Sequence, residues 1–234
     1  MKGWCVRPKS SWQNMISREI YLGLDDRHVV PLDAGGPHRG TPGAVRALRE
    51  LARAARADGI SLDVASSYRS FERQAQIFEE KYSGLRPVLD GNERPLNILV
   101  LDPRERVEAI TRFSAIPGLS RHHFGTDFDI YSRSLLPPGG KLELTRREYD
   151  PDQYFYPLGQ WLERHLEDYG FVRPYTGEGR VAYEPWHISF KSEAEQFIRA
   201  YDIREELKLL ESLNRSWSAP AREAAERGFR DFLA

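Results

Sequence analysis

The sequence predicts an α+β fold in which a small, mostly antiparallel sheet is flanked by helices. Helical and strand patterns are mixed along the chain without the regular alternation of a doubly wound sheet, and the strands are few and short. The length of 234 residues suits one domain that can bury a core without disulfide bonds. We therefore expect a single domain.

The first clear element is a helix that begins near residue 41. Prolines and glycines break any period in residues 1–40, so an irregular N-terminal arm packed on the domain is expected there. Thr41 is a good N-cap and Pro42 suits the first helical position. Gly59 ends the apolar periodicity, and the helix should end with it.

Elements of both kinds follow as far as residue 113. Residues 60–64 alternate as a strand does, and a helix is expected over residues 70–82. Residues 84–97 are rich in Pro, Gly and Asn and predict a loop. The capping box Asp102–Glu105 then opens a helix that runs to about Phe113.

A second strand is expected at residues 127–130, after a turn at Gly125. Phe128 and Ile130 would then share one face of the sheet, and Asp127 and Asp129 the other. This strand would therefore turn two carboxylates away from the core.

The last third should hold a helix, two strands and a helical end. The helix is expected over residues 156–169, and the strands over residues 171–175 and 181–190, the second interrupted at Pro185. A capping box, Ser192 with Glu195, would open the helical segment after it. We divide the domain into the arm of residues 1–40, a core of residues 41–191 and a C-terminal helical extension of residues 192–234.

The composition excludes several classes of protein. Lys and Arg total 34 against 35 Asp and Glu, and this balance argues against a nucleic-acid partner. Cys5 is the only cysteine, so neither an internal disulfide nor a thiolate metal cluster can form. Gly35-Gly36 precedes a proline and opens no helix, so nothing supports a nucleotide site.

The chain as given shows neither a signal peptide nor a transmembrane segment. Its first residues lack the apolar run of about 7 to 15 residues that a secretory signal needs, and nothing approaches the ~20 apolar residues of a membrane span. We expect a cytoplasmic protein as read, or a cell-envelope or periplasmic protein if a leader has been removed. The sequence does not determine the oligomeric state, and we expect a monomer.

Two short segments carry the residue types of a metal site. A chain reversal at Gly125 could bring His122 and Asp129 to one cation. If Pro185 bends its strand, Glu184 and His187 can point into the same cleft. Two histidines and an aspartate would give a catalytic zinc three ligands and leave one position open, with Glu184 free to act as a base.

The residues alone leave a structural alternative open. Glu184 and His187 could be a solvent-facing pair on a strand, and Asp127 and Asp129 could merely solvate one face of the sheet. Spacing does not decide between this interpretation and the metal site.

Three motifs resemble those of the zinc D-alanyl-D-alanine carboxypeptidase and dipeptidase family, which has the Hedgehog/D-Ala-D-Ala peptidase fold. Residues 120–129 (SRHHFGTDFD) resemble its Ser-x-His-x-x-Gly-x-Ala-x-Asp motif, and residues 184–187 (EPWH) match its Glu-x-Trp-His motif. Residues 67–74 (SYRSFERQ) are similar to its Tyr-Arg-Ser-x-x-x-Gln segment. The motifs occur in the family's order within residues 41–191.

The resemblance implies a role for each matching residue. His122, Asp129 and His187 would bind Zn²⁺, and Glu184 would be the catalytic base. Arg69 would contact the substrate and stabilise the oxyanion that develops during attack.

Three further residues match the segments that bind substrate in the family. Ser120 would help to hold the C-terminal carboxylate of the substrate, although capping the turn before His122 is an alternative role. Tyr68 and Gln74 would also bind substrate, although Tyr68 could be a core residue and Gln74 could support its helix.

Asp127 departs from the family pattern, which has a small residue at this position. It could be a carboxylate behind the metal ligands, a rival ligand, or the ion-pair partner of a nearby arginine. We place it outside the ligand set because a fourth protein ligand would close the site. His123 is also not expected to bind the metal.

The resemblance implies hydrolysis of the C-terminal D-alanine bond of a peptidoglycan stem peptide or muropeptide. An L,D-carboxypeptidase, or an endolysin-type peptidase that cuts L-Ala-D-Glu bonds, would use the same site. Two alternatives come from other classes. One is a non-haem iron oxygenase, which also uses two histidines and a carboxylate. The other is a metal-binding domain without catalysis.

Overall fold

The computed structural model describes residues 16–233, and residues 1–15 of the expected arm, Cys5 among them, lie outside this part. No helix within it is long and apolar enough to cross a membrane. The elements follow in the order α1 (Arg18–Tyr21), β1 (Val30–Pro31), β2 (Arg39–Gly40), α2 (Pro42–Ala57), β3 (Asp63–Ser66), α3 (Phe71–Tyr82), β4 (Val88–Leu89), β5 (Pro95–Leu96), η1 (Ile98–Val100), α4 (Pro103–Thr111), η2 (Arg121–Phe124), β6 (Asp127–Tyr131), η3 (Arg146–Tyr149), α5 (Tyr156–His165), η4 (Glu167–Tyr169), β7 (Phe171–Val172), β8 (His187–Phe190), α6 (Lys191–Ala200), α7 (Ile203–Ser212) and α8 (Ser218–Leu233), where η denotes a 3-10 helix.

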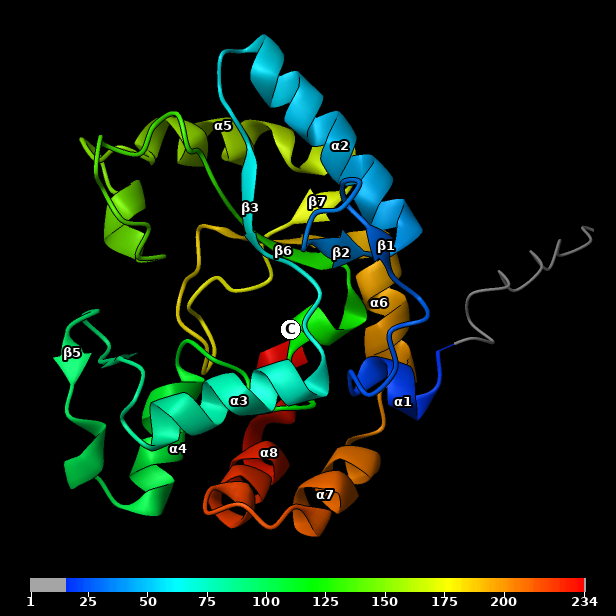
Figure 1. Ribbon diagram of the computed structural model, residues 1–234, viewed down its shortest axis with the longest axis vertical. Helices are drawn as coiled ribbons and strands as arrows, with labels where there is room; N and C mark the ends of the chain where they lie inside the picture. Colours follow the sequence, from blue (N-terminus) through cyan, green and yellow to red (C-terminus); the bar gives the residue numbers. More distant parts are fainter. Residues whose placement is uncertain (1–15, 234) are drawn as a thin grey trace, which may run out of the picture.

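The central sheet has four strands in the order β3-β6-β8-β7, and every neighbouring pair is antiparallel. Two small hairpins, β1–β2 and β4–β5, lie apart from it. The predicted class, helices around a small antiparallel sheet, is therefore confirmed (Figure 1).

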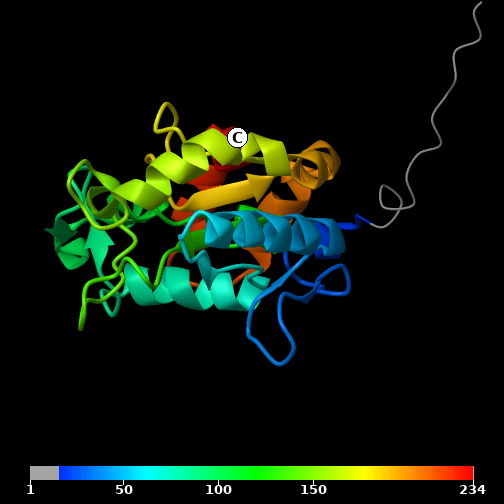
Figure 2. The same cartoon turned by 90° about the horizontal axis from the view of Figure 1, so that it is seen from above.

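One face of the central sheet is covered by α2 and α5. Figures 1 and 2 show these two helices together on the same side of the strands. Phe128 and Ile130 of β6 and Ile188 of β8 are completely buried in the core between this sheet face and the two helices. Because side chains alternate along a strand, Asp127 and Asp129 of β6 and His187 and Ser189 of β8 project from the opposite face.

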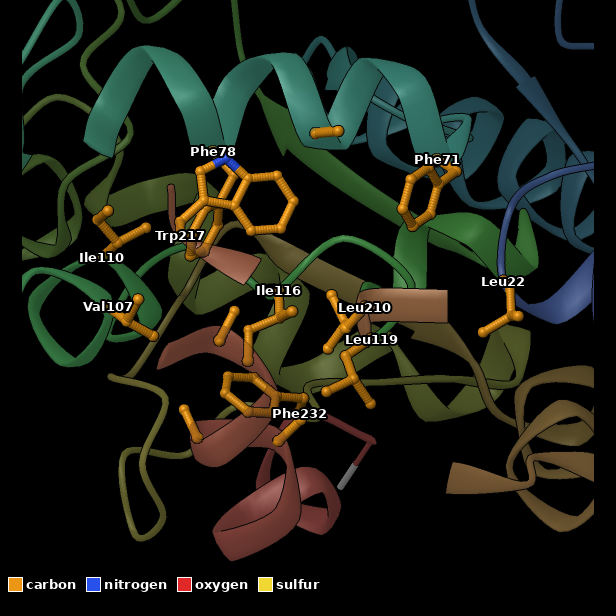
Figure 3. Close-up of a cluster of buried hydrophobic side chains, with 14 of the residues drawn as sticks. Leu22, Phe71, Phe78, Val107, Ile110, Ile116, Leu119, Leu210, Trp217 and Phe232 are labelled. Carbon is orange, nitrogen blue, oxygen red and sulfur yellow. The ribbon is translucent and has the colours of Figure 1, made fainter. Parts of the chain in front are cut away.

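A second core holds α3, α4, α7 and α8 together on the other side (Figure 3). Phe78 of α3 packs on Trp217 with ring centroids 5.1 Å apart, and both side chains are completely buried. Ile116 and Leu119 anchor the segment between α4 and η2 in the same core. Burying each large side chain contributes about 1.5–3 kcal/mol, so this core fixes both α3 and the chain that leads into η2.

Local signals place the starts of two helices correctly and miss a third. Thr41 caps α2 by accepting from the Ala44 amide, and the Asp102–Glu105 capping box opens α4. The predicted box at Ser192 is wrong, because α6 begins at Lys191 directly after β8 and the N-cap residue Phe190 makes no side-chain cap.

The strand predicted over residues 181–190 forms only in its last part, at His187–Phe190. This part pairs with β6 and β7. Pro185 has no N–H to donate, and the His187 amide donates to the Glu184 carbonyl at 3.2 Å, which closes a turn before β8 begins. The strand predicted over residues 171–175 likewise pairs only at Phe171–Val172.

Candidate metal centre

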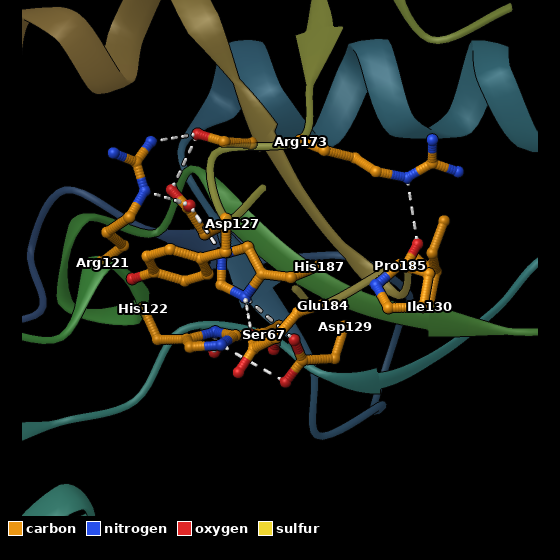
Figure 4. A network of polar contacts seen from close by, with 12 residues as sticks. Ser67, Arg121, His122, Asp127, Asp129, Ile130, Arg173, Glu184, Pro185 and His187 are labelled. Carbon is orange, nitrogen blue, oxygen red and sulfur yellow. Dashed lines mark hydrogen bonds and ion pairs between the residues drawn. The ribbon is translucent and has the colours of Figure 1, made fainter. Parts of the chain in front are cut away.

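His122, Asp129 and His187 meet on the sheet face opposite α2 and α5 (Figure 4). Asp129 and His187 are directly paired across β6 and β8. Gly125, with a φ of 70°, turns the chain between η2 and β6 and so returns His122 to the same place. All three side chains are buried, and one donor atom of each lies within 4.8 Å of the other two.

The side-chain donor atoms of His122, Asp129 and His187 lie close together. His122 Nε2 lies 3.3 Å from Asp129 Oδ2, and His187 Nδ1 lies 3.1 Å from Asp129 Oδ1. Asp129 Oδ1 is buried but receives no well-aligned hydrogen bond from any residue that the structure describes. A buried carboxylate oxygen without a hydrogen-bond donor suits coordination of a cation.

The outer nitrogen of each imidazole is held by an acceptor. His122 Nδ1 donates to the Ser67 carbonyl at 2.9 Å, and His187 Nε2 donates to Asp127 Oδ1 at 2.9 Å. A carbonyl and an ionised carboxylate can only accept, so the protons lie on these outer nitrogens. In the neutral rings the inner nitrogens, which face Asp129, then offer their lone pairs to a metal, and binding of a cation would displace a proton from His187. The donor set therefore fits a zinc ion.

Burial and charge perturb the pKa of each member of this group. Burial and Arg69 lower the pKa of His122 to about 4. Burial alone would lower the pKa of His187, but its contacts with Asp127 and Asp129 raise that pKa to about 9. Burial would raise the pKa of Asp129, but the two histidines hold it well below the ordinary value. Asp129 is thus an anion in a buried site, and a cation there would be strongly attracted.

Asp127 lies behind His187 and outside the three-residue group. It accepts from Arg121 Nε at 2.8 Å, Thr126 Oγ1 at 2.5 Å and Ser189 Oγ at 3.1 Å, as well as from His187. Burial would raise its pKa, but Arg121 and His187 lower it. Of the three readings left open by the sequence, the geometry matches two: Asp127 pairs with an arginine and supports a histidine of the group.

Arg121 is a residue that sequence reasoning did not single out. Besides Asp127, it donates to Ser189 Oγ at 2.6 Å and to the Leu233 carbonyl at 2.8 Å. It therefore ties the C-terminal end of α8 to the chain behind the site. The sequence did contain a signal for this ion pair: an arginine directly before His122 and a second carboxylate, Asp127, in the following strand.

Glu184 lies at the edge of the group in the turn before β8. Its Oε2 is 3.5 Å from His187 Nδ1, and its side chain is 9% exposed. Burial raises the pKa of Glu184 to about 8. A carboxyl group with a pKa near neutrality can both accept and release a proton, as a general base requires.

Arg69 approaches the group from the end of β3. Its Nη2 lies 3.7 Å from Asp129 Oδ2, and its Nη1 donates to Gln74 Oε1 at 2.7 Å. Gln74 is completely buried and donates in turn to the Ala115 carbonyl at 2.7 Å. The guanidinium is therefore held beside the three ligands, and its buried Nε has no hydrogen-bond partner among the described residues.

His123 fixes the backbone around Arg69 and does not join the metal group. Its Nδ1 donates to the Arg69 carbonyl at 2.7 Å, and its Nε2 accepts from the Gly118 amide at 3.0 Å. Both ring nitrogens are thus engaged away from the three ligands.

The remaining predicted site residues lie in two different places. Ser120 is buried immediately before η2 and makes no side-chain capping bond, so the alternative role in capping is not observed. The ring of Tyr68 packs edge-on against His28 at 5.6 Å and lies beneath Arg39. Its interactions are therefore with the N-terminal segment, and its part in substrate binding stays a prediction.

Comparisons with known proteins identify the family of this chain. The family model VanY, D-alanyl-D-alanine carboxypeptidase, matches residues 38–193. An uncharacterised Haemophilus influenzae protein is 40% identical over 83 residues, 34% of this chain and 63% of that protein. A D-alanyl-D-alanine carboxypeptidase of Enterococcus faecalis is 29% identical over 147 residues, 61% of this chain and 45% of that protein. The chain thus spans less than two thirds of each of these two relatives.

Two solved structures share the fold. One is VanYB in complex with D-alanine-D-alanine, at 24% identity and a TM-score of 0.51, covering 79% of this chain and 90% of that one. The other is a mutant of the D,D-pentapeptidase VanY in complex with Zn(II), at 23% identity and a TM-score of 0.50, covering 78% and 90%. With two thirds of its length matched by the family model, the chain belongs to the VanY D-alanyl-D-alanine carboxypeptidase family.

Proposed function

We propose that this protein is a zinc-dependent carboxypeptidase that releases the C-terminal D-alanine of peptidoglycan stem peptides. The convergence of His122, Asp129 and His187, with Glu184 and Arg69 at its edge, carries the proposal. Membership of the VanY family supports the substrate class. The Zn(II) bound by the VanY mutant supports the choice of metal.

In the proposed reaction His122, Asp129 and His187 hold the metal. A zinc ion bound there supplies Lewis acidity toward water and toward the scissile carbonyl. Glu184 takes a proton from the attacking water at its carboxylate and passes it to the leaving amine of D-alanine. Arg69, oriented by Gln74, places positive charge where the carbonyl oxygen becomes anionic. Ser120 would bind the terminal carboxylate of the substrate, and Gln74, whose two amide atoms are engaged by Arg69 and the Ala115 carbonyl, would act through Arg69.

The other readings of this site are less well supported. An L,D-carboxypeptidase or an L-Ala-D-Glu endopeptidase would use the same groups on another bond, and product analysis separates them. A non-haem iron oxygenase has no need of a carboxyl group 3.5 Å from a ligand histidine, and neither does a non-catalytic metal-binding domain. Neither class agrees with the family match.

Two variants test the proposal, with zinc content and D-alanine release as readouts. Glu184→Gln should keep one zinc per chain but lose activity by roughly 10² to 10⁴-fold, because it removes the base and not a ligand. His122→Ala should lose the zinc. Glu178→Gln, at an exposed glutamate of the same loop, is the matched control. Near wild-type activity of Glu184→Gln would remove the base from the mechanism, and full zinc in His122→Ala would overturn the ligand set.

A further inference from the structure

Lys81 is a half-buried cation without a carboxylate partner in the part of the chain that the structure describes. It lies near the end of α3, and its Nζ donates to Ser114 Oγ at 3.0 Å. No other interaction of its side chain occurs among residues 16–233, and no aspartate or glutamate there forms an ion pair with it. Removing an ammonium group from water without a counter-ion is unfavourable.

The surroundings of Lys81 are positively charged. Burial, and then Arg86 and Arg69, lower its pKa to about 8, and Glu184 opposes them more weakly. Lys81 is therefore near enough to Arg69 and Glu184 to sense both charges, yet it pairs with neither. Such a position favours an anion that the protein itself does not supply.

Lys81 follows the face of α3 that leads away from the metal group. Gln74, which holds Arg69, lies seven residues earlier, so the two side chains share one face of the helix. Gln74 binds the carbonyl of Ala115 and Lys81 binds the side chain of Ser114, so both rest on the same short segment. At 1.5 Å per residue, Lys81 lies about 10 Å along the helix from Gln74.

That spacing matches a peptide substrate. An extended chain advances about 3.3–3.6 Å per residue, so about 10 Å corresponds to about three residues of backbone, or to two residues and a long acidic side chain. A peptide whose scissile bond lies at the metal group could thus bring to Lys81 an acidic group two or three residues before that bond.

We propose that Lys81, supported by Ser114, is a specificity-determining residue that binds a carboxylate of the stem peptide two or three residues before the scissile bond. The inference rests on the proposed function and identifies the part of the substrate that this face of α3 recognises. Two sources offer this chemistry: the free carboxylate of the γ-linked D-glutamate, and the side-chain carboxylate of a diaminopimelate at the third position.

The test compares the wild-type zinc enzyme with Lys81→Met on four matched pentapeptides. D-glutamate or its amide D-isoglutamine occupies the second position, and diaminopimelate or L-lysine the third. For the peptide that carries the recognised carboxylate, Lys81→Met should raise KM about 10- to 100-fold with little change in kcat, because it removes a charge-assisted contact outside the reacting atoms. The increase should disappear for the partner peptide that lacks this carboxylate, which identifies the source.

Lys208→Met is the control, because that lysine is 69% exposed on α7 and pairs with Glu205. Equal KM for wild type and Lys81→Met on all four peptides would overturn the inference, as would an increase that is the same with and without either carboxylate. If the wild-type zinc enzyme releases D-alanine from none of the peptides, it is the proposed function that fails.

Stability separates a binding role from a structural one. Removing a half-buried, unpaired ammonium should leave the urea midpoint of Lys81→Met equal to or above that of wild type. Lys81→Arg, which keeps the charge, should recover most of the lost affinity. Lys81→Gln provides the same kinetic comparison if the methionine variant does not fold. A clear loss of stability in both neutral variants would show that Lys81 is structural and would overturn the inference.

Discussion

Replacing Asp127 by asparagine should weaken zinc binding although Asp127 is not a ligand. The carboxylate is completely buried and accepts four hydrogen bonds, from Arg121, Thr126, His187 and Ser189. Asparagine keeps the shape but removes the charge. The hydroxyls of Thr126 and Ser189 can rotate to accept from the new amide group, so the oxygen should stay with Arg121 and His187.

The expected losses of zinc affinity and of stability follow from the contacts that remain in Asp127→Asn. His187 keeps a weaker acceptor for Nε2, and loss of a partner behind a metal ligand lowers metal affinity by about 10- to 100-fold. Arg121 stays buried without its counter-ion, and breaking such a pair costs about 3–5 kcal/mol. Since Arg121 also donates to Ser189 and to the Leu233 carbonyl, we expect about 3 kcal/mol.

The two effects are measured separately. Zinc affinity is determined without denaturant by competition with a chelating dye, and stability by urea unfolding in the presence of a chelator. Asp168→Asn is the matched control, because that side chain is 74% exposed. Wild-type zinc affinity in Asp127→Asn would refute the argument that Asp127 orients His187 for the metal.

Three further predictions concern pH and backbone geometry. Burial raises the pKa of Glu206 well above 4.5, and neither of its oxygens has a hydrogen-bond partner within residues 16–233, so folding should lose stability as pH rises above 4.5. Glu206→Gln should therefore stabilise the protein in urea unfolding by more at about pH 8 than at about pH 5, and an equal effect at both would contradict the assignment. Because burial and neighbouring arginines lower the pKa of Lys81 to about 8, KM for the recognised peptide should rise as pH passes above that value, whereas a pH-independent KM would refute the carboxylate contact. Gly125 has a φ of 70°, and a Cβ there would collide with Val29, so Gly125→Ala should cost about 1–3 kcal/mol in urea unfolding; an unchanged midpoint would show that the turn tolerates a side chain.

The sheet face that carries the metal group was predictable because it depends on local alternation. Phe128 and Ile130 point into the core under α2 and α5, which leaves Asp129 on the opposite face. The partner of Asp129 was less accessible from sequence. His187 pairs with it through the register of β6 and β8, and register is a tertiary property that no single segment encodes.

Other features escaped prediction for identifiable reasons. The hairpins β1–β2 and β4–β5 have two residues in each strand, too few to show an alternating pattern. The backbone carbonyl of Ser67 holds His122 from 55 residues away, and a carbonyl has no sequence signature. In the sequence, Lys81 resembles an ordinary surface lysine of an amphipathic helix. Only the structure shows that no carboxylate within residues 16–233 pairs with it.

The most direct test of the central claim is the mass of the products. The zinc-loaded protein is incubated with a muropeptide that ends in D-Ala-D-Ala and, separately, with a tetrapeptide that ends in one D-Ala, and the products are analysed by mass spectrometry. We predict the loss of a single D-alanine from the first substrate, and no such loss when zinc is removed by a chelator. An intact D-Ala-D-Ala peptide after incubation with the fully zinc-loaded enzyme would contradict the account.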